Sequence, residues 1–331
     1  MHLHFKCFYT LKIKAHYNKI ILYFFRNKIR RYFPPEPFHQ LQLYNLLRLH
    51  QNQINYKNLF YILEEIGQQK NLKSLSLYKN QLTELPKAVW QLTGLEVLNL
   101  ADNKFSALPE GIGNLTNLRM LDLGHNDLTD LPESLGKLTA LKFLYLSNNH
   151  LSSVPESLEN LQELIYLNVT DNQLSSLPGN IAKLTNLIEL RLYNNQLKSL
   201  PNVIEGLMNL RELHVMNNQL TSLPQLIGKM KNLKKLMLQG NEIESLPDSI
   251  GNTSNLTDLD LRYNKLTNIP ETIGELQKLR FLDLRANQLS SLPSSLGNLK
   301  SLEKLDLRWN SFQSIPAWFT HLEQRGCIIY T

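Results

Sequence analysis

Cysteine is nearly absent from this sequence, which holds two cysteines in 331 residues. Cys7 and Cys327 lie at opposite ends of the chain, so no disulfide framework is indicated. Such usage favours a reducing compartment, and we expect a cytoplasmic protein. The sequence also has no CxxC pair, so a zinc site with thiolate ligands is unsupported, and we expect neither a metal nor a cofactor.

Signatures of catalysis are missing as well. The chain contains no GxxxxGK[ST] phosphate loop, no GxSxG elbow, no HExxH zinc motif and no kinase set. Long hydrophobic runs are also lacking. The brief apolar run Ile20–Phe25 has six residues, which is too short to span a bilayer. The sequence therefore predicts neither an enzyme nor a protein that crosses a membrane.

Positive charge is confined to the beginning of the chain. The net charge is +6, yet residues 1–40 alone carry +7, with eight lysines and arginines against the single acid Glu36. The remaining residues therefore sum to −1, and the pI near 9.1 does not describe a basic domain. Binding of nucleic acid is accordingly the weakest of the function classes considered.

Residues 1–40 form a basic arm that is rich in aromatic side chains. Tyr17, Ile20, Ile21 and Phe24 share helical spacing among basic residues, so residues 11–33 could make a weak contact with a membrane surface. The alternative is a loose tail or a helix folded against the first repeat. We favour this alternative because chain termini are commonly loose.

A 23-residue repeat dominates the rest of the sequence. Each copy opens with the phrase L-x-x-L-x-[LV]-x-x-N and continues with a second phrase that contains a proline. The eleven opening leucines are Leu72, Leu95, Leu118, Leu141, Leu164, Leu187, Leu210, Leu233, Leu256, Leu279 and Leu302. Each is followed eight residues later by an asparagine, from Asn80 to Asn310, and fourteen residues later by a proline, from Pro86 to Pro316. A strict period of this kind indicates a solenoid of stacked units.

The two phrases predict different backbone conformations. In the first phrase apolar residues alternate with variable ones, so each repeat supplies one strand of a parallel sheet whose leucines enter a shared core. The asparagine side chain has both a donor and an acceptor, so stacked asparagines can satisfy the turn that follows. Proline cannot occupy a central strand, and it suits an early position of a short helix or 3-10 turn.

These phrases make residues 72–325 similar to the leucine-rich-repeat family, in particular to its 23-residue type with an L-P dipeptide. That type is found in Ras-pathway scaffold proteins, plant intracellular Ras-group proteins and many bacterial repeat proteins. The resemblance implies an α/β solenoid, a horseshoe with a parallel sheet on its concave side and short helices or 3-10 turns on its convex side. It also implies protein binding as the commonest role.

The repeat decays at both ends. Residues 41–71 keep part of the apolar pattern and are predicted to be a degenerate capping repeat, which a solenoid needs. Eleven repeats follow over 72–325, and residues 326–331 are predicted to form a C-terminal cap strand. We expect Trp318, Phe319 and Ile329 to close the core there, with Cys327 as a small buried hydrophobe.

Two sets of residues stand out on the predicted concave face, where the third, fifth and seventh residues of each first phrase point outward. The first set, which we call the Asp/Arg columns, comprises Asp260, Arg262, Asp283, Arg285, Asp306 and Arg308. Either these columns dock a charged partner or they neutralise one another. We favour the internal ladder because stacked like charges repel unless opposite charges lie beside them. The arginines should also leave no carboxyl pKa raised, which disfavours acid–base catalysis.

The second set, the middle surface, comprises Phe143, Tyr145, Tyr166, Glu189, Arg191, Tyr193, Glu212, His214, Met216 and Met237. Aromatic residues, methionine and arginine are enriched in the cores of protein interfaces. A sheet also tolerates β-prone aromatics for their own sake. Because the large residues cluster, we predict that this surface binds a protein partner.

The sequence thus predicts a protein-binding module, an intracellular scaffold or adaptor in signalling. The alternative is the recognition subunit of an enzymatic complex whose chemistry lies in another chain or domain.

Overall fold

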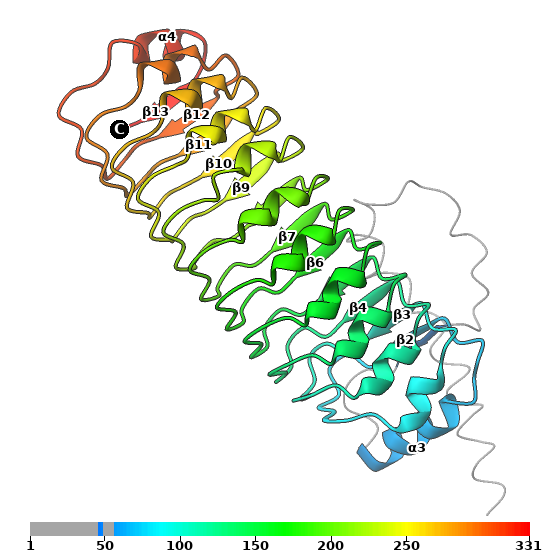
Figure 1. Cartoon of the computed structure of the whole chain (residues 1–331). Helices are drawn as coiled ribbons and strands as arrows, with labels where there is room; N and C mark the ends of the chain where they lie inside the picture. Colours follow the sequence, from blue (N-terminus) through cyan, green and yellow to red (C-terminus); the bar gives the residue numbers. More distant parts are fainter. Residues whose placement is uncertain (1–45, 49–55) are drawn as a thin grey trace, which may run out of the picture. The chain divides into compact units, whose positions relative to one another are not determined.

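The computed structural model describes residues 46–48 and 56–331, and the fold is reported for these residues. One parallel sheet of thirteen strands runs through them in sequence order (Figure 1). The strands are β1 Leu46–Arg48, β2 Ser74–Ser76, β3 Val97–Asn99, β4 Met120–Asp122, β5 Phe143–Tyr145, β6 Tyr166–Asn168, β7 Glu189–Arg191, β8 Glu212–His214, β9 Lys235–Met237, β10 Asp258–Asp260, β11 Phe281–Asp283, β12 Lys304–Asp306 and β13 Ile328–Tyr330.

Short helical turns on the other side of the core connect the strands (Figure 1). The 3-10 helices are η2 Lys87–Gln91, η3 Glu110–Asn114, η4 Glu133–Lys137, η5 Glu156–Asn160, η6 Gly179–Lys183, η7 Asn202–Gly206, η8 Ile227–Lys229, η9 Asp248–Asn252, η10 Glu271–Glu275 and η11 Ser294–Asn298. Two α-helices stand at the ends, α3 Tyr56–Ile66 and α4 Phe319–Gln324. The predicted α/β solenoid is confirmed.

The register of the sheet follows the sequence period. Leu121 on β4 pairs with Leu144 on β5, which pairs with Leu167 on β6, so each strand meets its equivalent 23 residues later. These leucines lie inside one continuous core that extends from Leu59 to Cys327. No repeat could bury its own apolar side, and the neighbours supply the burial.

The asparagine that ends each first phrase joins its turn to the preceding repeat. The Nδ2 of Asn172 donates to the carbonyl of Val169 in its own turn and to that of Leu146 in the preceding repeat, at 3.2 and 2.9 Å. Its Oδ1 accepts from the backbone N–H of Leu151 at 3.0 Å. Equivalent contacts recur from Asn103 to Asn310. The buried backbone groups of the turns are thereby satisfied, as the sequence predicts.

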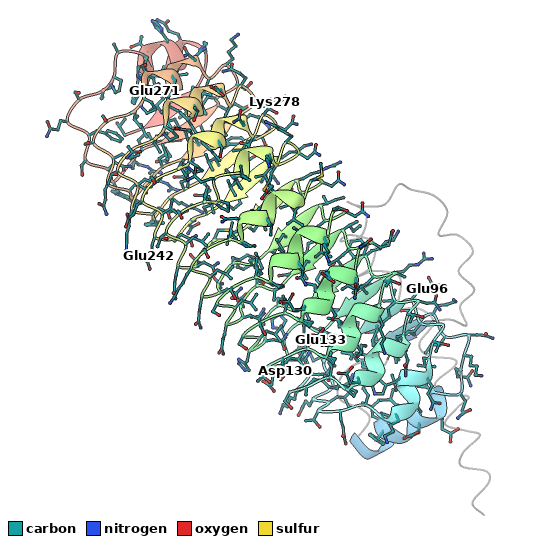
Figure 2. The ribbon with its side chains drawn as sticks, in the orientation of Figure 1. Glu96, Asp130, Glu133, Glu242, Glu271 and Lys278 are labelled. Atoms are coloured by element: carbon teal, nitrogen blue, oxygen red, sulfur yellow. The ribbon has the colours of Figure 1, made fainter. Side chains whose placement is uncertain are left out.

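Further polar ladders run along the convex side. A second asparagine donates to a carbonyl 24 residues earlier, as Asn186 does to Gln162 at 2.8 Å. The carboxylates of Glu133 and Glu271, which Figure 2 labels, accept from the backbone N–H groups of Ser157 and Ser295 at 3.0 and 3.1 Å. Because each contact links adjacent repeats, the stack is held by polar as well as apolar interactions.

The prolines lie just outside the 3-10 helices. In η3 the proline Pro109 is the extended residue before the helix, with φ −75°, and its carbonyl accepts from the N–H of Ile112 at 3.1 Å. The predicted position inside the first helical turn is therefore wrong by one residue. The proline still serves the same purpose, because its fixed φ sets the direction in which the helix begins.

Both ends depart from the repeat. At the N-terminal end α3 replaces a 3-10 turn, and it buries Leu59 and Leu63 in the core beside η2. At the C-terminal end Phe319, Leu322 and Cys327 are buried, with Trp318 and Ile329 packed against them. This arrangement confirms the expected closure of the core. That residues 41–71 act as a cap stays a prediction.

The basic arm at 1–40 lies outside the described residues, and so does the proposed membrane contact through 11–33. Within 46–48 and 56–331, no helix combines the length and the apolar character that crossing a membrane requires.

Candidate functional site

The middle surface is assembled from β5 to β9 and the residues that directly follow them. Side chains alternate along each strand, so the third and fifth residues of a repeat share one face while the fourth enters the core. The register sets Tyr166, Glu189 and Glu212 in one row, and Asn168, Arg191 and His214 in the next. The residues selected from the sequence therefore do lie together.

Aromatic rings form the centre of the middle surface. The rings of Tyr145 and Tyr166 lie with centroids 5.0 Å apart and planes inclined by 39°. The guanidinium of Arg191 lies 5.8 Å from the centroid of the Tyr166 ring, within the range of a cation–π contact. Burial, with help from Asp122 and Glu189, raises the pKa of Tyr145 to about 12. Its hydroxyl is therefore protonated at neutral pH and available as a donor.

Charged side chains in the middle surface are paired. Glu189 is buried and pairs with Arg191 on the same strand. Glu212 contacts Lys235 at 3.0 Å and His214 at 3.1 Å. The hydrogen bond from His214 is the main cause that lowers the pKa of Glu212 to about 2. Both carboxylates thus have opposite charge or a donor beside them in a largely shielded setting.

The apolar members of the middle surface are half-buried rather than exposed. The most exposed large apolar side chains lie elsewhere, with Met208 66% exposed near the convex turns and Trp309 62% exposed near the C-terminal end. Sequence reasoning missed these residues. Half-burial does not weaken the middle surface as a candidate, because rings held by their neighbours lose little freedom on binding.

The eighth residue of each repeat adopts a left-handed backbone conformation, which we did not predict. In order, these residues are Lys79, Asp102, His125, Asn148, Asp171, Asn194, Asn217, Gly240, Tyr263, Ala286 and Trp309. Asparagine, aspartate and glycine tolerate this conformation, whereas tyrosine, alanine and tryptophan are strained in it. Tyr263 and Trp309 stand with ring centroids 6.3 Å apart. The run of Asn, Asp and Gly in this column was the available signal.

The Asp/Arg columns form the internal ladder that the sequence favoured. Each arginine contacts the aspartate two residues before it, Arg262 with Asp260 at 3.1 Å and Arg308 with Asp306 at 2.7 Å. Arg285 contacts Asp283 at 2.6 Å and reaches Asp306 in the next repeat at 3.4 Å. The charges are therefore neutralised within the protein.

One expectation about the Asp/Arg columns is wrong. Burial raises the pKa of Asp260 above its usual range, and the contribution of Arg262 in the opposite direction is smaller. By contrast, Arg308 and Arg285 together outweigh burial at Asp306 and lower its pKa. The two positions share one sequence pattern, so the difference arises from how many arginines reach each carboxylate.

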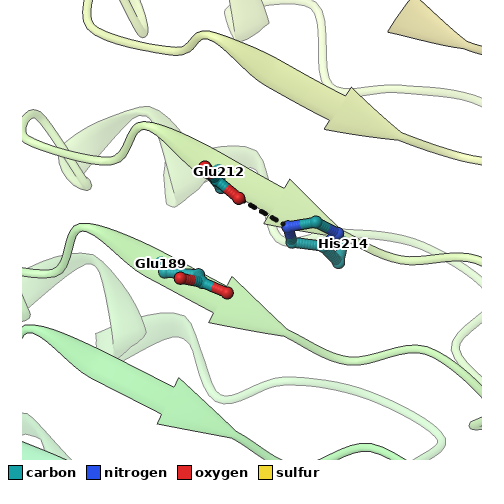
Figure 3. Close-up of side chains that lie close together, drawn as sticks. All are labelled: Glu189, Glu212 and His214. Atoms are coloured by element: carbon teal, nitrogen blue, oxygen red, sulfur yellow. Dashed lines mark hydrogen bonds and ion pairs between the residues drawn. The ribbon is translucent and has the colours of Figure 1, made fainter. Parts of the chain in front are cut away.

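A group of metal-ligating side chains also went unnoticed in the sequence. Glu189, Glu212 and His214 lie close together on β7 and β8, and Figure 3 shows the hydrogen bond between the last two. Their signal was present, since Glu189 precedes Glu212 by one repeat and His214 follows Glu212 by two residues. Motif spacing along the chain does not reveal such a group, because one ligand comes from the neighbouring repeat.

Comparison with protein families agrees with this fold. A model described as leucine-rich repeat region matches residues 29–142 and 118–236. Two further models described as leucine rich repeat match residues 231–289 and 301–322. No curated protein matches the sequence.

Solved structures supply more distant relatives. A leucine-rich-repeat protein of Leptospira interrogans is 31% identical over 87% of this chain and 90% of its own, with a TM-score of 0.49. The plant peptide hormone receptor RGFR1, solved in complex with RGF2, is 30% identical over 75% of this chain, with a TM-score of 0.64. The functional domain of InlJ from Listeria monocytogenes is 26% identical over 80%, with a TM-score of 0.66.

The chain covers 45% of the RGFR1 chain and 54% of the InlJ chain. The solenoid, its asparagine ladder and the family models agree with one another. Leucine-rich repeats are in general protein-binding modules rather than catalytic domains. This chain belongs to the leucine-rich-repeat family.

Proposed function

We propose that the chain is a protein-binding module that holds a partner on the middle surface of its concave face. In the cell it acts as a scaffold or adaptor in signalling, in the cytoplasm. The observation that carries the proposal is the contact among Tyr145, Tyr166 and Arg191 at the centre of this surface.

Tyrosine and arginine are over-represented among the residues that dominate binding energy, and such residues gather near the centre of an interface. Here the two rings rest on each other and the guanidinium rests on the second ring. A partner therefore meets groups that are already ordered, which lowers the entropy cost of association. The Asp/Arg columns offer no comparable surface, because their charges contact one another.

The cellular role draws on further support. Low cysteine usage favours the cytoplasm, and the 23-residue L-P phrases resemble those of Ras-pathway scaffolds. The structure of the plant receptor RGFR1 was solved with RGF2 bound, which is consistent with a protein or peptide as the partner class.

A pulldown followed by mass spectrometry tests the proposal. We expect wild-type protein to capture a reproducible set of proteins that the variant Y145A/Y166A/Y193A fails to capture. The stability of a solenoid is distributed over many interfaces, so this variant should retain its circular dichroism spectrum and most of its thermal stability.

A matched control uses aromatic residues outside the middle surface. The variant Y263A/W309A removes two more exposed rings at the C-terminal end of the solenoid. It should capture the same proteins as the wild type. Loss of capture by the control with retention by the triple variant would move the binding surface to the C-terminal repeats and contradict the proposal.

A further inference from the structure

Glu189, Glu212 and His214 converge at the centre of the middle surface (Figure 3). One potential ligand atom from each lies within 4.8 Å of the other two. The sheet creates this arrangement, because the register places Glu189 opposite Glu212, and alternation returns His214 to the same face two residues later. All three side chains project from strands, which position ligands more accurately than loops do.

We propose that these three side chains bind a divalent transition-metal ion of the zinc class. Imidazole nitrogen and carboxylate oxygen are both established ligands of zinc. The imidazole selects against magnesium and calcium, which prefer oxygen ligands alone. Three protein ligands leave at least one coordination position for water. The proposal goes beyond partner binding, since it concerns an ion that the chain binds by itself.

The present contacts of Glu212 are compatible with an ion. Its Oε1 contacts the Nζ of Lys235 at 3.0 Å, and its Oε2 contacts the Nε2 of His214 at 3.1 Å. An ion can take the place of the proton between Oε2 and Nε2 while Lys235 remains on Oε1. The pKa of Glu212, lowered to about 2, means that this carboxylate is already deprotonated at neutral pH, as a metal ligand must be.

Glu189 requires an exchange of partners. Its carboxylate pairs with Arg191, and its side chain is 2% exposed. The side chain of Arg191 is 36% exposed and already lies over the ring of Tyr166. When an ion takes its place beside Glu189, the guanidinium can keep this ring contact. The shielded position of Glu189 also strengthens its attraction for an ion.

Calorimetric titration of the full, chelator-stripped chain with ZnCl2 tests the site. His2, His4, His16, His39 and Cys7 lie in the arm and can take up zinc independently, so the site is measured by difference. We expect E212Q and H214Q each to lose one equivalent of zinc per chain, or to bind it at least about 10-fold more weakly than the wild type. MgCl2 and CaCl2 should leave the wild type and both variants alike.

Three further variants sharpen the result. H150Q is the matched control, because His150 is also a surface histidine 3.8 Å from a carboxylate, that of Asp127, and should bind zinc as the wild type does. H214C, which supplies another zinc ligand, should restore the lost equivalent. R191Q removes the group that competes for Glu189 and should tighten binding.

Equal zinc stoichiometry and affinity in the wild type, E212Q and H214Q would overturn the proposal. So would restoration by neither H214C nor any change in R191Q once all variants show the wild-type circular dichroism spectrum. The pulldown with Y145A/Y166A/Y193A is performed with a chelator present, so failure of the metal site and failure of partner binding are separate outcomes.

Discussion

The middle surface and the Asp/Arg columns occupy equivalent positions of the same scaffold but use them differently. In the middle surface Arg191 pairs with the third residue of its repeat, Glu189, and rests on the ring of Tyr166. In the columns Arg285 pairs with the fifth residue, Asp283, and also reaches Asp306 in the next repeat. The columns thus direct their charges at one another, whereas the middle surface keeps rings and side chains directed at a partner.

This comparison teaches that one strand position can serve stability in one repeat and recognition in another. The backbone is the same in both, with strands of three residues in a common register. What differs is the chemistry of the side chain two residues away and one repeat away. Substitutions at matched positions in the two regions should therefore have different consequences.

The largest effect on stability is expected from Asp306 in the columns. D306A removes a carboxylate that is 0% exposed and lies 2.7 Å from Arg308 and 3.4 Å from Arg285. Loss of one partner from a shielded ion pair should lower the free energy of unfolding by about 3 kcal/mol. The matched variant in the middle region is N168A, which removes a single contact with the N–H of Thr170 at 3.1 Å, at a cost of about 1 kcal/mol. Urea unfolding measures both, and equal losses would contradict the difference between the regions.

A pair of glycines on the convex side compares packing between the regions. A Cβ at Gly251, between β9 and β10, would lie 2.2 Å from the carbonyl oxygen of Thr272. G251A should therefore lower the free energy of unfolding by about 2 kcal/mol, because the next repeat must move. A Cβ at Gly179, before β7, meets nothing within 4 Å. G179A should leave stability unchanged or raise it by roughly 0.5 kcal/mol in the same urea measurement.

The dependence of stability on pH should have opposite signs at Glu212 and Asp260. The pKa of Glu212 is lowered to about 2, so its ionised form stabilises the fold above the ordinary value of 4.5, and this contribution disappears as the pH falls toward 2. With a chelator present, the advantage of the wild type over E212Q should be about 1–2 kcal/mol at pH 6 and should vanish near pH 2.

Asp260 supplies the contrast from the columns. Its pKa is raised above the ordinary value of 3.8, so its ionised form destabilises the fold at neutral pH. D260N should be at least as stable as the wild type at pH 7, and its advantage should shrink as the pH falls through the raised pKa. Thermal melts from pH 2 to pH 7 measure both variants. A D260N variant less stable than the wild type at pH 7 would show that the arginines dominate.

The smallest expected effect concerns the left-handed residue of each repeat. Ala286, in the columns, has φ 51°, and A286G should raise the free energy of unfolding by roughly 0.5–1 kcal/mol. In the middle region this position is already Asn194, which bonds to Asp171 and Asn217 at 2.6 and 2.7 Å. N194A should lower stability by a similar amount. A change of the same sign in both would mean that backbone strain does not decide this position.

The sequence predicted the fold well because the fold depends on a period. Leucines every 23 residues fix the register of the sheet, and the asparagine ladder follows from one residue with both a donor and an acceptor. The α-helix α3 could not be predicted in this way, because the repeat pattern has decayed there.

The candidate site was predicted only in part. Columns read down the repeats brought Tyr145, Tyr166 and Arg191 together, and their contacts agree with that reading. The raised pKa of Asp260 depends on burial, and the convergence of Glu189 with His214 depends on how side chains turn across two strands. Neither property is visible in residue spacing alone.

The most direct test of the account is the dissociation constant of the captured partner, measured for two variants that change the two regions. Y145A/Y166A/Y193A removes rings from the middle surface, and R262Q/R308Q removes two arginines from the columns. Because a central interface residue contributes about 2 kcal/mol or more, the first variant should bind at least about 100-fold more weakly than the wild type. The second should bind within about threefold of the wild type, since exposed paired charges contribute little to affinity. A large loss in R262Q/R308Q with unchanged binding by the tyrosine variant would contradict the account.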